Sequence, residues 1–92
     1  MEQQHRLDLI NIMATIHETP SVINDHWDTV SPLLEELTAT APEGLEGMVA
    51  MICLHFNNAI KFKDLKVIKF EVESGLIKLN RYFQKLNAFK KD

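Results

Sequence analysis

The chain has 92 residues, of which 46% are hydrophobic and 25% are charged, and its formal net charge is −3; this length predicts one domain, residues 1–92, with a thin core. The ordinary globular composition excludes intrinsic disorder, and the single cysteine, Cys53, excludes an internal disulfide framework. Residues 1–20 carry three acids against one base and no apolar block followed by a small-residue cleavage site, which predicts no signal peptide and a cytoplasmic location.

The first helix is expected over residues 2–18. The side chains that should face the core recur at steps of three and four residues: Leu9, Met13 and Ile16. Thr19-Pro20 should end this helix, because the residue before a proline is pushed out of the helical region. The same pair is expected to open the next helix, with Thr19 as its N-cap and Pro20 at its first position.

The second segment continues with another helical stripe of apolar side chains: Ile23, Trp27, Val30, Leu34 and Leu37. Pro32 interrupts it and would cost about 3 kcal/mol inside a regular helix. Because the stripe stays in phase on both sides of Pro32, we expect one helix kinked there or two short helices, the second capped by Ser31. The kinked helix is the favoured alternative.

The most apolar part of the chain is Gly47–Ile60, 14 residues without a formal charge, too few for a bilayer span of roughly 20. We expect a central helix over Pro42–Lys63 with these side chains toward the core: Leu45, Val49, Ile52, Phe56 and Ala59. Three further apolar side chains lie off that stripe: Met48, Met51 and Leu54. A helix that is apolar nearly all round must be covered by its neighbours or by a partner. Gly44 and Gly47 would permit a close backbone approach.

Two patterns compete in the last segment. Ile68–Val72 alternates as a strand would, and 60–63 alternates before it, so a hairpin is conceivable. Seven apolar positions instead keep helical spacing over 22 residues: Leu65, Ile68, Val72, Leu76, Leu79, Phe83 and Leu86. The longer pattern predicts a helix, with Asp64 as N-cap and Ser74-Gly75 as the place to bend or break. The expected fold is all-α, a small antiparallel bundle of about four helices.

The charge is distributed unevenly along the chain. Residues 1–46 carry −8 and residues 47–92 carry +5. The simplest interpretation is that the two halves pack together and screen each other. The alternative is a nucleic-acid-associated protein that uses the basic Lys61–Lys85 region, with these candidate phosphate contacts: Lys61, Lys63, Lys66 and Lys69. No helix-turn-helix, zinc-finger or RNA-binding motif accompanies them, so nucleic acid is the less favoured partner.

No catalytic, cofactor-binding or metal-ligating residues are expected. The four histidines never lie three or four residues apart, and one cysteine cannot build a structural zinc site. Cys53 and His55 are two residues apart on a helix, so they point in different directions and cannot form a nucleophile–base couple. His55 is expected at the edge of the apolar stripe, hydrogen-bonded or half-exposed.

The last helix should also carry a second apolar face. At 100° per residue, four side chains lie almost opposite its core stripe: Val67, Phe70, Ile77 and Arg81. An apolar line mixed with basic residues is typical of a protein-binding surface. We therefore expect a non-enzymatic protein–protein interaction module (an adaptor, inhibitor, immunity-type or regulatory protein) that binds another protein or itself as a homodimer, without membrane association.

Overall fold

The computed structural model describes residues 1–89, which form four α-helices and no strand. The elements are α1 (Gln3–Glu18), the 3-10 turn η1 (Pro20–Val22), α2 (Ile23–Ala39), α3 (Glu46–Lys61) and α4 (Leu65–Phe89). The all-α prediction is confirmed. Of the alternating residues that could have formed a hairpin, 60 and 61 end α3, 62 and 63 lie in the loop after it, and Ile68–Val72 belongs to α4.

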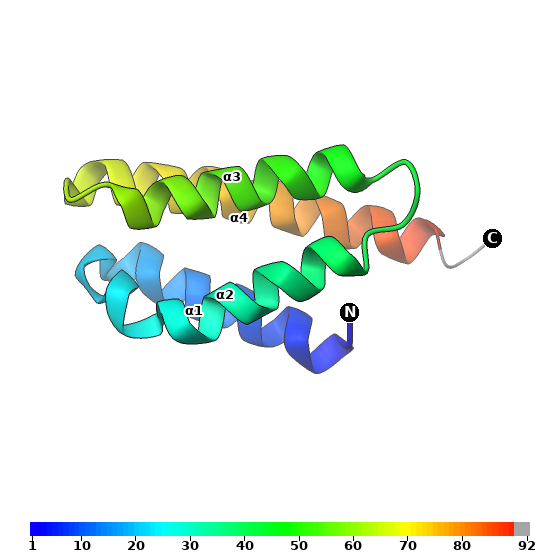
Figure 1. Cartoon of the computed structure of the whole chain (residues 1–92), viewed down its shortest axis with the longest axis horizontal. Helices are drawn as coiled ribbons and strands as arrows, with labels where there is room; N and C mark the ends of the chain where they lie inside the picture. The colour runs from blue at the N-terminus through cyan, green and yellow to red at the C-terminus, as the bar shows by residue number, and fades with distance from the viewer. Residues whose placement is uncertain (90–92) are drawn as a thin grey trace.

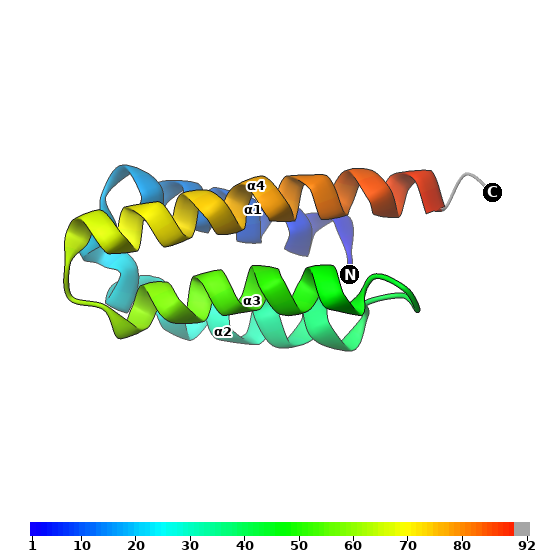
Figure 2. The same cartoon turned by 90° about the horizontal axis from the view of Figure 1, so that it is seen from above.

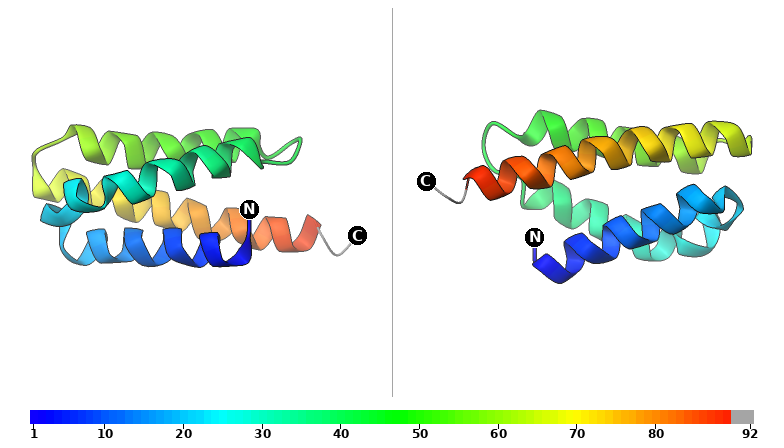
Figure 3. Two further views of the ribbon diagram at one scale, coloured as in Figure 1. Left: turned by 60° about the horizontal axis from the view of Figure 1, so that its bottom comes forward. Right: turned by 180° about the vertical axis from the view of Figure 1, so that it is seen from behind.

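Successive helices run antiparallel and form two layers (Figure 1). One layer holds α3 and α4 and the other α1 and α2, and the view from above shows α4 over α1 and α3 over α2 (Figure 2). Each helix therefore has two neighbours, and the apolar stripes of all four meet in one core. The further views show α1 running beside α4 (Figure 3), so that Arg6 of the first turn of α1 reaches Phe83 near the end of α4.

The helix α2 is continuous through Pro32, so the alternative of two short helices is wrong. Pro32 is exposed, and the stripe on both sides of it is buried, with Trp27 half-buried. Burial of this long apolar stripe offsets the backbone hydrogen bond that the proline removes. At the other end, Pro20 begins a 3-10 turn rather than α2 itself, and Thr19 precedes it without a side-chain hydrogen bond.

The central helix is shorter than predicted, Glu46–Lys61 instead of Pro42–Lys63. Gly44 has φ 96°, a left-handed conformation that ends any helix begun at Pro42 and makes residues 42–45 a turn. The Glu46 carboxylate accepts a hydrogen bond from the Gly44 N–H and stabilises this turn. At the other end Phe62 is extended (φ −93°, ψ 148°), which stops α3 at Lys61.

At the start of α4, the predicted N-cap is correct, whereas the predicted burial of the first apolar residue is not. The Lys66 N–H donates a 2.9 Å hydrogen bond to Oδ1 of Asp64, so Asp64 caps the helix as predicted. Leu65, expected in the buried stripe, is exposed because it lies at the end of the bundle, beyond the core.

The helix does not break at Ser74-Gly75, since α4 is one helix from Leu65 to Phe89. Gly75 has a packing role instead: a Cβ built on it would lie 2.4 Å from Cε1 of the buried Phe56 ring. The Gly44 and Gly47 positions, where the sequence would permit a close approach, have no neighbouring atom within 4 Å of an added Cβ. The close approach of α3 to α4 therefore depends on Gly75.

Candidate partner-binding face

The exposed side of α4 carries the second apolar face that the sequence predicts. Phe70 is 62% exposed and Ile77 is 49% exposed, although both are large apolar side chains. Val67 is half-buried and Arg81 is exposed on the same side. The opposite side of α4 supplies Ile68, Val72 and Leu79 to the core. The helix thus presents apolar surface in two directions, and only one of them is covered by the bundle.

The helix α3 extends this surface with two side chains that the sequence analysis did not assign to it. Met51 is 45% exposed and Leu54 is 49% exposed. Met51 and Arg81 line one shallow concavity of about 210 Å³ between the two helices, together with Met48 and Lys78. The signal was present in the sequence, because Met51 and Leu54 lie off the core stripe of an over-apolar helix.

A hydrogen-bonded pair joins α3 to α4 beside this surface. Nδ1 of His55 lies 3.1 Å from Oε2 of Glu71, and both side chains are mostly buried. Leu54 and Phe70 each precede a member of this pair, so each points about 100° further toward solvent from the helix contact. They lie on the same outer side of the α3–α4 layer. We call Met51, Leu54, Phe70, Ile77 and Arg81 the α3–α4 face.

Basic side chains outnumber acidic ones around the α3–α4 face, where Glu73 is an exposed acid between Phe70 and Ile77. The candidate phosphate contacts are all exposed near the turn that joins α3 to α4: Lys61, Lys63, Lys66 and Lys69. Lys85 is exposed beside Arg81, one turn further along α4. Within residues 1–89, the acid–base pairs closer than 4.0 Å all use a histidine, so no lysine or arginine there has a carboxylate partner at that distance. The basic charge of this layer is therefore available to a partner.

The other layer is acidic and lacks exposed basic charge. Arg6 is the single lysine or arginine of residues 1–46, and it is only 6% exposed. Its Cζ lies 5.4 Å from the centroid of the Phe83 ring, and its Nε donates to the carbonyl of Met1. The two layers pack together as expected, but direct ion pairs between them are absent from the described part of the chain. The protein consequently has one acidic face and one basic, apolar face.

His55 and Cys53, the side chains best suited to a nucleophile–base couple, point in different directions. His55 faces Glu71 on α4, whereas Sγ of Cys53 faces α2 and lies 3.6 Å from Oγ1 of Thr38. Burial raises the pKa of the Cys53 thiol above its ordinary value, and the Thr38 hydrogen bond opposes this only in part. A thiol with a raised pKa is a poor nucleophile. Among residues 1–89, no group of three His, Cys, Asp or Glu side chains is placed to hold a metal ion.

None of the helices formed by residues 1–89 combines the length and the apolar character that a membrane span requires. Comparisons with protein-family models, with curated proteins and with solved structures found no match for this chain.

Proposed function

We propose that this protein is a small non-enzymatic module that binds another protein, or a second copy of itself, through the α3–α4 face. The observation that carries the proposal is the exposure of four large apolar side chains from two helices on one side of the bundle. Adaptor, inhibitor, immunity-type and regulatory proteins all work by such binding. The cytoplasmic location stays a prediction from the sequence.

The energetics support binding that combines apolar contact with charge. Covering one such side chain contributes about 1.5–3 kcal/mol, and association costs roughly 4–15 kcal/mol of rigid-body freedom. The four apolar side chains together contribute at most about 6–12 kcal/mol, which is comparable with the association cost, so apolar contact alone does not give tight binding. Carboxylates opposite the unpaired basic side chains around the face would add affinity and speed the encounter. The partner surface that fits is apolar at its centre and acidic at its edge.

The double variant Phe70→Ser/Ile77→Ser tests this proposal. Both side chains are exposed, so we expect the helical circular dichroism and the melting temperature to change little, while self-association or capture of a partner is lost. Sedimentation velocity and affinity capture from native cells measure these two kinds of binding. The matched control is Leu7→Ser, which removes an exposed leucine from α1, outside the α3–α4 face. If the double variant unfolds, both residues belong to the core and the interface proposal fails.

A second candidate function, nucleic-acid binding, is favoured by the four exposed lysines near the α3–α4 turn. Binding through phosphates should weaken steeply as salt rises, with a slope that counts the phosphates contacted. We would measure binding to a generic DNA duplex and a generic RNA between about 50 and 200 mM salt. Lys66→Gln/Lys69→Gln should reduce the slope by about two. Undetectable binding at the lowest salt would exclude this function.

A further inference from the structure

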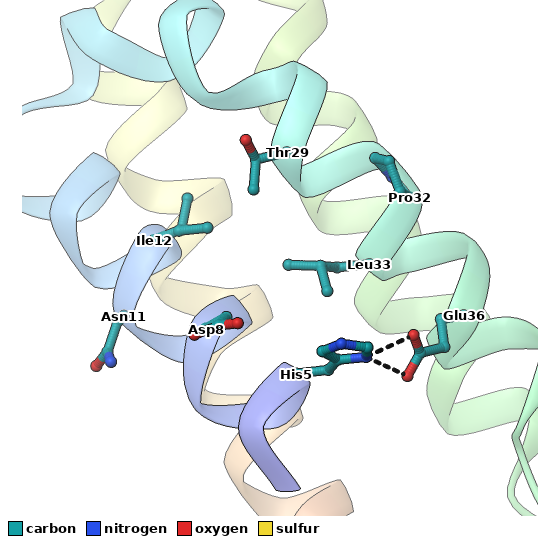
Figure 4. A pocket seen from close by; sticks show the side chains of 8 residues that line it. All are labelled: His5, Asp8, Asn11, Ile12, Thr29, Pro32, Leu33 and Glu36. Atoms are coloured by element: carbon teal, nitrogen blue, oxygen red, sulfur yellow. Dashed lines mark hydrogen bonds and ion pairs between the residues drawn. The ribbon is translucent and has the colours of Figure 1, made fainter. Parts of the chain in front are cut away.

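The acidic layer contains an open groove that faces away from the α3–α4 layer (Figure 4). It lies between α1 and α2 and has a volume of about 480 Å³. Eight residues line it: His5, Asp8, Asn11, Ile12, Thr29, Pro32, Leu33 and Glu36. The close-up shows His5, Ile12, Leu33 and Glu36 between the two helices and Asn11 pointing away from α2, with the ribbons of the other layer behind them. We call this the α1–α2 groove.

The groove combines an apolar centre with an acidic end. Ile12 and Leu33 are both half-buried and supply apolar surface from opposite sides. At one end, Nδ1 of His5 lies 2.8 and 3.0 Å from the two carboxylate oxygens of Glu36, and Asp8 lies on the same helix as His5. Because Arg6 is buried, no exposed lysine or arginine of residues 1–46 offsets these carboxylates.

These properties complement the exposed side of α4. In the groove, the apolar Ile12 lies one helical turn from Asp8, and Leu33 lies about one turn from Glu36. On α4, the apolar Ile77 lies one turn from Arg81 on its C-terminal side and one turn from the exposed Glu73 on its N-terminal side. An apolar group and a charge of opposite sign thus recur at the same spacing on two separate surfaces of one molecule. We call the exposed side of α4, with Phe70, Ile77 and Arg81, the ridge. A ridge that fills the groove must place an apolar group and a basic group at this spacing.

We propose that the α1–α2 groove receives the exposed side of α4 from a second copy of this chain. Ile77 then covers the apolar centre of the groove, and Arg81 meets the carboxylates at its acidic end. This inference rests on the proposed function and names the partner of the α3–α4 face. A symmetric contact between two α3–α4 faces is disfavoured, because it brings unpaired basic side chains together. Groove and ridge are different patches, so the contact is head-to-tail and continues into longer oligomers unless it closes into a ring.

The experiment uses one variant that blocks the groove and one that removes the ridge. Thr29→Arg places a long basic side chain at an exposed groove position, and Phe70→Ser/Ile77→Ser removes the ridge. Sedimentation velocity of the wild type should show oligomers that dissociate as the protein is diluted or as salt is raised. The self-association constant of each variant alone should be at least tenfold lower than that of the wild type. Mixed, they should form a 1:1 dimer and nothing larger, because one copy keeps its ridge and the other its groove.

The matched control is Asn24→Arg, which introduces the same arginine at an exposed α2 position outside the groove and should assemble as the wild type does. Asp8→Arg alters the groove independently from α1, because it replaces a lining carboxylate with a long basic side chain, and guards against misfolding of Thr29→Arg. A monomeric wild type, a groove variant that still self-associates, or a mixture that stays monomeric overturns the inference. A monomeric wild type that captures another protein through Phe70 and Ile77 would leave the proposed function standing. If Phe70→Ser/Ile77→Ser keeps both self-association and partner capture, the proposed function is wrong.

Discussion

Phe56→Ala is expected to lower the free energy of unfolding by about 3–5 kcal/mol, the range for truncating a large buried aromatic side chain. Phe56 is fully buried at the centre of the core, where its ring packs against Gly75 of α4. Alanine would leave a cavity that the surrounding helices can close only in part. For so small a protein, this loss is a large share of the roughly 5–15 kcal/mol that stabilises a native domain.

Urea and thermal unfolding measure this effect, and the melting temperature should fall by more than about 10 °C. The control is Phe62→Ala, because Phe62 lies just past the end of α3 and is exposed. It removes the same number of atoms and should change stability by about 0.5 kcal/mol or less. If Phe56→Ala and Phe62→Ala melt alike, Phe56 is not at the centre of the core.

Gly75→Ala is expected to destabilise the protein by about 1–3 kcal/mol, the usual cost of overpacking a core. In an open helix the same change would stabilise by up to about 1 kcal/mol, since alanine is the better helix former. Here the new Cβ would lie 2.4–2.9 Å from three atoms of the Phe56 ring. The ring is fully buried and cannot move into solvent, so α3 and α4 must separate to admit the methyl group. Steric cost therefore exceeds the gain in helix propensity.

A pair of control variants isolates this contact. Gly47→Ala makes the same substitution in α3, where no atom lies within 4 Å of the new Cβ, and should be neutral or slightly stabilising. Combining Gly75→Ala with Phe56→Leu should cost less than the sum of the two single changes, because the smaller side chain makes room for the methyl group. Additive losses, or a stabilised Gly75→Ala protein, would show that the ring does not limit how closely α3 and α4 pack.

The sequence by itself determined the helices and the sides that they bury. Each stripe repeats over two or more turns, and that of α2 over about four, so a single unfavourable residue such as Pro32 does not change the outcome. Asp64 was identifiable as a cap because capping is a local hydrogen bond between a side chain and the next backbone N–H groups. The exposed pair Phe70 and Ile77 was also predictable, since a helix that is apolar on two opposite sides cannot bury both in so thin a bundle.

Tertiary structure decided the features that depend on how two helices meet. The role of Gly75 follows from its position opposite Phe56, which no local pattern encodes. Met51 and Leu54 join Phe70 on one face because α3 packs on α4 with His55 turned toward Glu71. The burial of Arg6 depends on Phe83, far along the chain, and the α1–α2 groove needs residues from two helices. Helical periodicity fixes the direction of each side chain around its own axis, whereas only packing fixes which side chains of different helices lie together.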